Sequence, residues 1–290
     1  MRLRTALFGV LLFLQSALVL TGGAVRLTGS GLGCPTWPEC TPGSYTPVPY
    51  QAEGQLHAWI EFGNRLLTFA LLLSALIAVI YVLKSGRKDL RSLAAGQVLG
   101  IIGQGVLGGI TVLTDLHPLP VAGHLLLSML LIAGATSLYS RRHEPHVKVS
   151  APTKTLSLLS QSHIVISFIV LILGTIVTGS GPHAGDEKAQ RFGFDIRSVA
   201  ILHADAVILL MGLTIALLVA ASVTHTTKKA IYIFFGISLA QGGVGYAQYL
   251  TGIPELLVAI HLAGATIFWI AAWRIRLSVV RKSQQERDQQ

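Results

Sequence analysis

The chain contains one stretch of sequence twice. Residues 101–136 and residues 238–273 align over 36 positions without a gap, at a constant offset of 137. Several residues are identical in both copies: Gln104 and Gln241, Gly105 and Gly242, Gly108 and Gly245, Ala122 and Ala259, His124 and His261. A match of this length at one offset indicates an internal duplication and not merely a shared apolar composition. Each copy predicts a helical hairpin with a histidine near the start of its second helix.

The composition places this duplication in a membrane. Of the 290 residues, 52% are hydrophobic and only 12% are charged, whereas a soluble domain of this size needs far more charge to cover its surface. A helix that crosses a bilayer needs about 20 mostly apolar residues. Eight runs approach or exceed that length: 5–25, 58–83, 92–113, 119–140, 157–179, 199–222, 229–250 and 255–275. The first run is too long for a typical secretory signal, so we expect it to be a helix.

These runs predict an all-α polytopic membrane protein. A shared Thr-Gly-Ser-Gly, at 28–31 and at 178–181, extends the duplication beyond the matched hairpins. The eight transmembrane helices are therefore expected to form two duplicated four-helix bundles, residues 1–150 and residues 151–290.

The basic residues predict the orientation of the helices. Alternate loops, counted from the N-terminus, hold 17 of the 22 Lys and Arg residues, and loops rich in Lys and Arg face the cytoplasm. Both termini are therefore expected to be cytoplasmic. The bases are dispersed over short loops without interleaved aromatic residues, so the net charge of +9 indicates topology and no nucleic-acid partner.

Both cysteines of the chain lie in the first outer loop, at about 26–57, within Cys34-Pro-Thr-Trp-Pro-Glu-Cys40. Two close cysteines on the oxidising side of a membrane most often form a disulfide. Free thiols and half of a metal site are the alternatives, and a zinc site is disfavoured because no further pair of ligands is nearby.

The second apolar run carries four polar side chains close to its outer end: His57, Glu61, Asn64 and Arg65. Their spacing places them on one helical face. An ionisable residue inside a membrane helix is a functional candidate by default. The alternative is that Glu61 and Arg65, one turn apart, only neutralise each other. We favour a functional role because a purely structural ion pair is costly to place in hydrocarbon.

Four side chains are expected to reach the same depth in the membrane. Asn64, His124, His203 and His261 each lie five to seven residues into a predicted helix that starts on the outer side, which corresponds to roughly 7–10 Å. His203 corresponds to either Asn64 or His57, because the loop lengths of the two halves differ. His163 is expected near the opposite interface. The remaining histidines are expected to be solvated: His117, His143, His146, His183 and His225.

Haem explains these histidines best. Imidazole is a common axial ligand of haem iron, and a helical bundle can place two histidines on opposite sides of one iron. We expect His203 and His261 to form such a pair in the second half. The glycines of the repeat would let helices approach or leave room for a flat macrocycle.

The sequence resembles the haem A synthase family, membrane enzymes that convert haem O to haem A for cytochrome oxidases. The likeness covers nearly the whole chain. It is most specific in the stretch 22–40, from Gly-Gly-Ala-Val-Arg-Leu-Thr-Gly-Ser-Gly through the second cysteine, and it includes Glu61-Phe-Gly-Asn-Arg65 and the three histidines near helix starts.

The resemblance implies a haem b cofactor in the second half, ligated by His203 and His261. It implies haem O as the substrate in the first half, with His124 as a ligand and Glu61 as the catalytic residue. A structural or redox role for the cysteine pair is implied as well. The expected location is a bacterial plasma membrane with both haem sites toward the outer side. A haem O synthase and an electron acceptor are the partners to consider, and oligomers are compatible with the sequence.

Two departures from the family pattern affect the first half. Asn64 stands where the family has a histidine, and a second cysteine pair is missing. The substrate iron is then five-coordinate through His124, or Asn64 holds a water there, or His57 supplies the missing ligand. Arg65 could instead pair with a haem propionate.

Two other classes of protein compete with the enzyme. One is a non-enzymatic or quinone-linked cytochrome b, which would explain His203 and His261 but not Glu61. The other is a transporter that uses Glu61 and Asp205 as proton sites, although the matched central helix breaks typical of that class are absent from the sequence.

Overall fold

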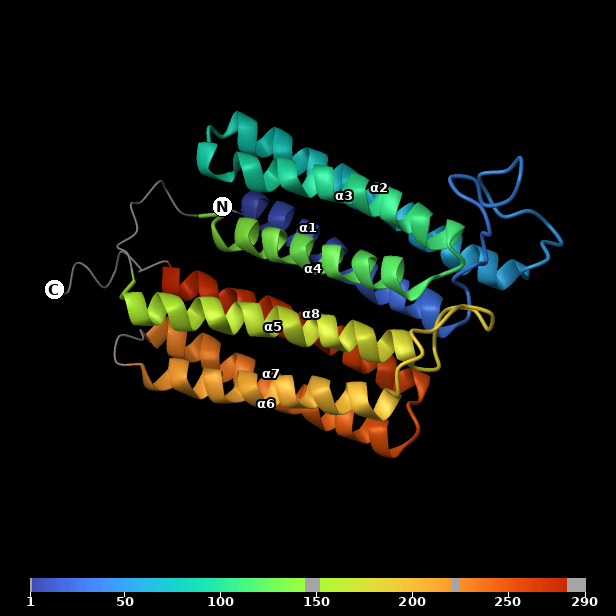
Figure 1. The fold of residues 1–290 in the computed structure, drawn as a ribbon. Helices are drawn as coiled ribbons and strands as arrows, with labels where there is room; N and C mark the ends of the chain where they lie inside the picture. The colour runs from blue at the N-terminus through green and yellow to red at the C-terminus, as the bar shows by residue number, and fades with distance from the viewer. Residues whose placement is uncertain (1, 144–151, 221–224, 281–290) are drawn as a thin grey trace.

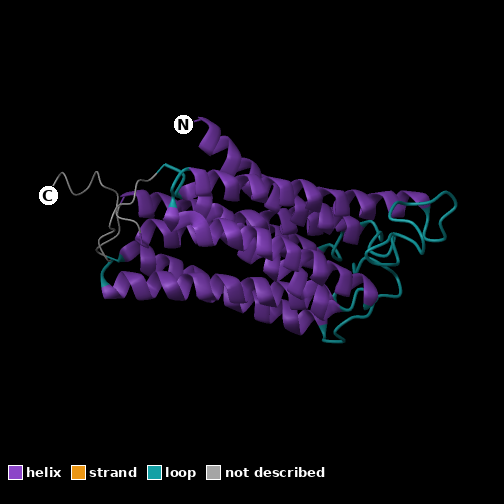
Figure 2. Cartoon of the chain, turned by 90° about the horizontal axis from the view of Figure 1, so that it is seen from above, coloured by secondary structure: helices purple, strands orange, loops and turns teal. Residues whose placement is uncertain are grey.

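The computed structural model describes residues 2–143, 152–220 and 225–280, and these ranges contain eight long helices and no β-strand (Figures 1 and 2). The helices are α1 (Arg2–Leu27), α2 (Gln55–Lys84), α3 (Arg91–Leu113), α4 (Pro118–Ser140), α5 (Lys154–Ser180), α6 (Ile196–Val219), α7 (His225–Leu250) and α8 (Glu255–Val280). Each is long and apolar enough to cross a membrane. The all-α fold with eight candidate membrane spans is thereby confirmed.

Several helices begin earlier than the sequence indicated. The helix α2 starts at Gln55, three residues before the predicted run, so it includes His57 in its first turn. The helix α7 starts at His225, which the sequence placed in a loop; its side chain is nevertheless exposed. Helices extend past their apolar runs because polar residues at their ends reach water or the membrane interface.

The helices are arranged in four successive pairs across the molecule (Figure 1). Helices α2 and α3 lie at one edge, followed by α1 with α4, then α5 with α8, and finally α6 with α7. Each half therefore forms a four-helix unit, and α1 and α4 of the first unit pack against α8 of the second, with α4 also touching α5. The predicted boundary between the halves, at residues 150 and 151, lies outside the described residues, as does His146.

Two tryptophans of α8 join the halves. The indole Nε1 of Trp269 donates a hydrogen bond to the Met129 carbonyl at 2.6 Å, and Nε1 of Trp273 donates to the Ser137 hydroxyl at 2.7 Å. Trp269 and Met129 are almost completely buried. A buried indole needs a partner for its N–H group, so these two bonds fix α8 against α4 while the rings fill the junction.

The long outer loops lie at the end of the molecule opposite the start of α1 (Figure 1). The backbone N–H of Gly31 donates to the Gly185 carbonyl at 2.9 Å, and Arg26 donates to the carbonyls of Thr178, at 2.8 Å, and His183. His183 is itself half-buried, with Nε2 2.8 Å from the Ile253 carbonyl. The expectation of a solvated His183 was therefore wrong, because the loops fold onto one another.

The start of α6 is fixed by an N-terminal cap. The Asp195 carboxylate accepts hydrogen bonds from the Ser198 hydroxyl at 2.7 Å and from the Ser198 backbone N–H at 2.9 Å. These hydrogen bonds hold the pKa of Asp195 below its usual value. A capped start sets the position of every later residue of α6, including His203.

Candidate functional site

Each of the three predicted haem ligands lies against a glycine of the preceding helix. A Cβ atom added to Gly108 would lie 3.4 Å from Cε1 of His124, and one added to Gly245 would lie 3.5 Å from Cε1 of His261. Gly108 and His124 align with Gly245 and His261 in the internal repeat, so the same contact occurs in both halves. His203 has the same relation to Gly174 of α5, at 3.4 Å.

The three imidazoles also share an unused ring nitrogen. Nδ1 of His124, of His203 and of His261 is buried, and none has a hydrogen-bond partner among the residues that the structure describes; the same holds for both ring nitrogens of His163. Buried polar atoms are nearly always hydrogen-bonded, so each exception needs an explanation. A neutral imidazole can ligate haem iron. Among the four histidines of the described residues with such buried nitrogens, only His124, His203 and His261 also lie against a glycine of the preceding helix, and this shared setting fits an axial-ligand role.

His203 and His261 lie on opposite helices of the second four-helix unit. The order of packing around that unit is α5, α6, α7 and α8, with α8 returning to α5. His203 is the eighth residue of α6 and His261 is the seventh residue of α8, and both helices start at the end of the molecule where the disulfide loop lies (Figure 1). The two side chains are therefore at matched depth, roughly 9–11 Å from the helix starts.

The corresponding pair in the first unit is His124 and Asn64. His124 is the seventh residue of α4, whereas Asn64 is the tenth residue of α2 because α2 begins early. The Oδ1 atom of Asn64 accepts a hydrogen bond from the Thr21 hydroxyl at 2.7 Å, and its Nδ2 lies 3.9 Å from the Cβ position of Gly22. Asn64 thus faces α1 as His203 faces α5.

His57 occupies a different level. It is the third residue of α2, and its Nδ1 lies 2.8 Å from the Ser30 hydroxyl in the first outer loop. The geometry therefore matches His203 with Asn64 and not with His57. With that match, the positions of Glu61 and Arg65 correspond to Ala200 and Ala204, so the second half has no equivalent of the ion pair.

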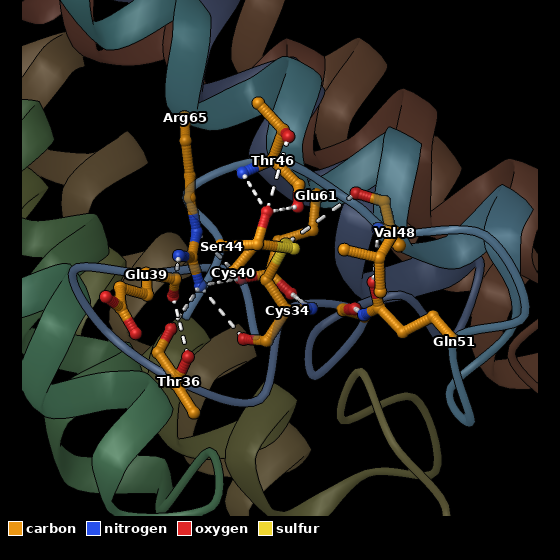
Figure 3. The surroundings of a disulfide bond; sticks show 12 residues. Cys34, Thr36, Glu39, Cys40, Ser44, Thr46, Val48, Gln51, Glu61 and Arg65 are labelled. Carbon is orange, nitrogen blue, oxygen red and sulfur yellow. Dashed lines mark hydrogen bonds and ion pairs between the residues drawn. A yellow bond between two sulfur atoms is a disulfide. The ribbon is translucent and has the colours of Figure 1, made fainter. Parts of the chain in front are cut away.

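Glu61 is buried, with 6% of its surface exposed, and both carboxylate oxygens are engaged (Figure 3). Oε2 accepts a hydrogen bond from the Cys34 backbone N–H at 2.7 Å. Oε1 accepts from Arg65, at 2.6 Å from Nη2 and 3.1 Å from Nε. Arg65 also donates to the carbonyls of Cys34 at 2.9 Å, Thr36 at 3.1 Å and Glu39 at 3.1 Å. The pair therefore fastens the first outer loop to α2, which the sequence did not predict.

The disulfide predicted between Cys34 and Cys40 is present, with a Cα–Cα distance of 4.3 Å, at the short end of the usual range. Both cysteines are fully buried, and Figure 3 shows their disulfide close to Glu61 and Arg65. The disulfide closes a compact loop whose backbone carbonyls point at Arg65, so it presents three acceptors to one guanidinium group.

The structure does not join the three first-half candidates directly. Among the described residues, no hydrogen bond connects Glu61, Asn64 and His124 to one another. Gln104 of α3 contacts the backbone of α4 at His124 and not the imidazole. Its side-chain amide donates to the His124 backbone carbonyl at 3.0 Å and to the Ser128 hydroxyl at 2.7 Å. Glu61 faces the outer loop, and Asn64 faces α1.

His163, expected near the opposite interface, is buried between helices. It is the tenth residue of α5, it is 1% exposed, and its ring packs edge-on against Phe234 of α7 with the ring centroids 4.7 Å apart. The sequence also did not predict the contacts of Thr21 with Asn64 and of Gly174 with His203. Predicting them requires knowing which faces of the helices pack against each other.

Comparisons with known proteins agree with one another. The model of the cytochrome oxidase assembly protein family matches residues 5–185. A haem A synthase of Sinorhizobium fredii is 25% identical over 323 aligned positions, which cover 91% of this chain and 87% of that protein. A haem A synthase of Shewanella oneidensis is also 25% identical, over 96% of this chain and 97% of its own length. A haem A synthase of Geobacillus thermodenitrificans is 26% identical over 40% of this chain and 35% of that protein.

Proposed function

This chain belongs to the cytochrome oxidase assembly protein family, and on that premise we propose that it converts haem O to haem A by oxidising one methyl group to a formyl group. Relatives that carry the name haem A synthase align with more than nine tenths of the chain. The conversion is a four-electron oxidation: two hydroxylations of the methyl group give a hydrated aldehyde, which loses one water, so that with water as the oxygen source the net change is –CH3 + H2O → –CHO + 4 H+ + 4 e−, and the electrons pass to an electron acceptor.

We assign the second unit to a haem b cofactor. His203 and His261 would hold its iron from α6 and α8, since they lie at matched depth with unused ring nitrogens. Gly174 and Gly245 lie directly beside the two imidazoles. The haem would supply one-electron redox chemistry, while the protein contributes the two ligands and an apolar surround.

We assign the first unit to the substrate. His124 would bind the iron of haem O, and Gln104 holds the backbone of His124 in place. Asn64 has no imidazole to offer, and its Oδ1 already accepts a hydrogen bond from Thr21, so His124 would be the main ligand that the first unit provides for the substrate iron.

Glu61 is the proposed catalytic residue. A buried negative charge can stabilise a cation that develops at the reacting methyl group, and the second unit has alanine at the matching position. Arg65 has another task, because three of its hydrogen bonds hold loop carbonyls. It is therefore a poorer partner for a haem propionate than the sequence suggested.

The proposed location is a bacterial plasma membrane, with both termini in the cytoplasm and both haem sites toward the outer side. The distribution of Lys and Arg supports this orientation. The helix starts that carry the candidate ligands lie at the same end as the disulfide loop, and a disulfide persists on the oxidising side. A haem O synthase and an electron acceptor are the partner classes that the reaction requires.

The observation that carries the proposal is the family match together with three buried imidazoles that each lie against a glycine of the preceding helix. The test is coexpression with a haem O synthase, followed by extraction and chromatography of the pigments. The parent protein should accumulate haem A, and His124→Ala should not. The control His163→Ala removes a buried histidine outside the site and should retain haem A formation. If the parent protein binds haem but yields no haem A, an electron-carrying cytochrome b becomes the better assignment.

A further inference from the structure

Trp37, in the middle of the disulfide loop, packs on a glycine of α3. A Cβ atom added to Gly109 would lie 2.6 Å from Cδ2, 2.8 Å from Cε2 and 3.0 Å from Cε3 of the indole. These distances are too short for any real side chain, so only glycine accommodates the ring there. Gly109 is buried, and Trp37 remains 41% exposed. The indole therefore covers the backbone of α3 from the outer side.

The position of this contact relates it to the substrate half. Gly109 follows Gly108, the residue against which the His124 imidazole lies. On its other side, the same loop is bound to α2 through Arg65 and through the bond from the Cys34 N–H to Glu61. The loop therefore bridges the outer ends of α2 and α3.

We propose that Trp37 is a positioning residue for the oxidation: seated on Gly109, it holds residues 34–40 so that the Cys34 N–H meets the Glu61 carboxylate, and it closes the outer end of the first unit beside His124. This proposal rests on the proposed function. It adds that the Glu61 carboxylate is oriented indirectly. Trp37, seated on Gly109 of α3, positions the Cys34 N–H and does not itself contact Glu61.

The hydrogen bonds of Arg65 hold the loop to α2 only, because all three loop carbonyls are approached from that helix. The start of the loop is held separately, where the Gly31 N–H donates to the Gly185 carbonyl. The contact of Trp37 with Gly109 connects residues 34–40 to α3. The disulfide makes the loop short and stiff, so a displacement of Trp37 is transmitted to Cys34 three residues away. Such a displacement would weaken the hydrogen bond to Glu61 and admit water.

The test enlarges Gly109 and then relieves the clash. Gly109→Ala should displace the indole, Trp37→Ala should remove it, and the double variant Gly109→Ala with Trp37→Phe should restore the seat because a smaller ring makes room for the methyl group. Gly96→Ala is the matched control on α3, since a Cβ there meets nothing within 4 Å.

The first measurement requires no haem. Because Cys34 and Cys40 are fully buried, a water-soluble phosphine can reduce their disulfide only when the loop opens. Overpacking by one methyl group costs about 1–3 kcal/mol, so the reduction rate should rise roughly tenfold or more in Gly109→Ala, and similarly in Trp37→Ala. It should stay at the parent rate in Gly96→Ala and return toward it in the double variant. A parent-like rate in both single variants would overturn the proposal.

The second measurement asks whether Trp37 acts through Glu61. Gly109→Ala should lower haem A formation in the parent background but cause no further loss in a Glu61→Gln background, since residues acting through one group are not additive. Full additivity would refute the positioning role. If the reduction rates behave as expected while the parent protein makes no haem A at all, the proposed function fails and the seat of Trp37 on Gly109 stands.

Discussion

Replacing Arg65 should destabilise the protein more than replacing Glu61, whereas replacing Glu61 should cost more activity. Arg65 donates three hydrogen bonds to loop carbonyls and two to Glu61. A hydrogen bond from a charged donor contributes about 1.5 kcal/mol at the lower end of its range. Because the Arg65 side chain is 20% exposed, part of each contribution is lost to solvent, and Arg65→Ala should cost about 3–4 kcal/mol.

The conservative variants should lose less stability than Arg65→Ala. Arg65→Lys keeps the charge but loses the planar fork, so it should retain one of the three carbonyl bonds and cost about 2 kcal/mol. Glu61→Gln has a single carbonyl oxygen, so it can accept from Arg65 or from the Cys34 N–H but not from both, and about 1 kcal/mol is expected for the acceptor that is lost. Thermal unfolding of the purified protein should show the order Arg65→Ala, Arg65→Lys, Glu61→Gln, from largest to smallest shift.

Haem A formation should follow a different order. If the Glu61 charge stabilises a developing cation, Glu61→Gln should lower the rate on the order of 10²–10³, although it is the most stable of the three variants. Haem O should still bind, because His124 lies on another helix. Activity losses that simply follow the stability order would refute the catalytic role of Glu61 and leave it as an anchor for the loop.

Three further outcomes are expected. His203→Ala should abolish the low-spin b-type spectrum that the proposed cofactor would give, because it removes one of its two proposed axial ligands, whereas His163→Ala should leave that spectrum unchanged; the reverse result would contradict the ligand assignment. Asn64→His should add a ligand opposite His124, convert the substrate iron to low spin and slow the reaction; an unchanged spectrum would show that position 64 does not face the iron. Alkylation without a reductant should label neither Cys34 nor Cys40, and mass spectrometry showing two labelled thiols in native protein would contradict the disulfide.

The fold and the cysteine pairing followed from the sequence. The length of each apolar run determines whether a helix can span a bilayer, and run length is a local property of the chain. The duplication with its fixed offset placed His124 and His261 at equivalent positions before any contact was known. Two cysteines six residues apart, in a loop expected on the oxidising side, most often form a disulfide. The pairing of Cys34 with Cys40 was therefore predictable as well.

The surroundings of Glu61 were decided only by the tertiary structure. The sequence placed Glu61 and Arg65 one turn apart on α2, a pattern that fits an isolated ion pair as well as a catalytic site. Their engagement by Cys34 depends on how the loop between α1 and α2 folds back, and helix periodicity holds no information on that path. The same is true of Trp37 on Gly109 and of Asn64 on Thr21. Residues far apart in sequence meet according to how helix faces and loops pack, and packing is a property of the whole chain.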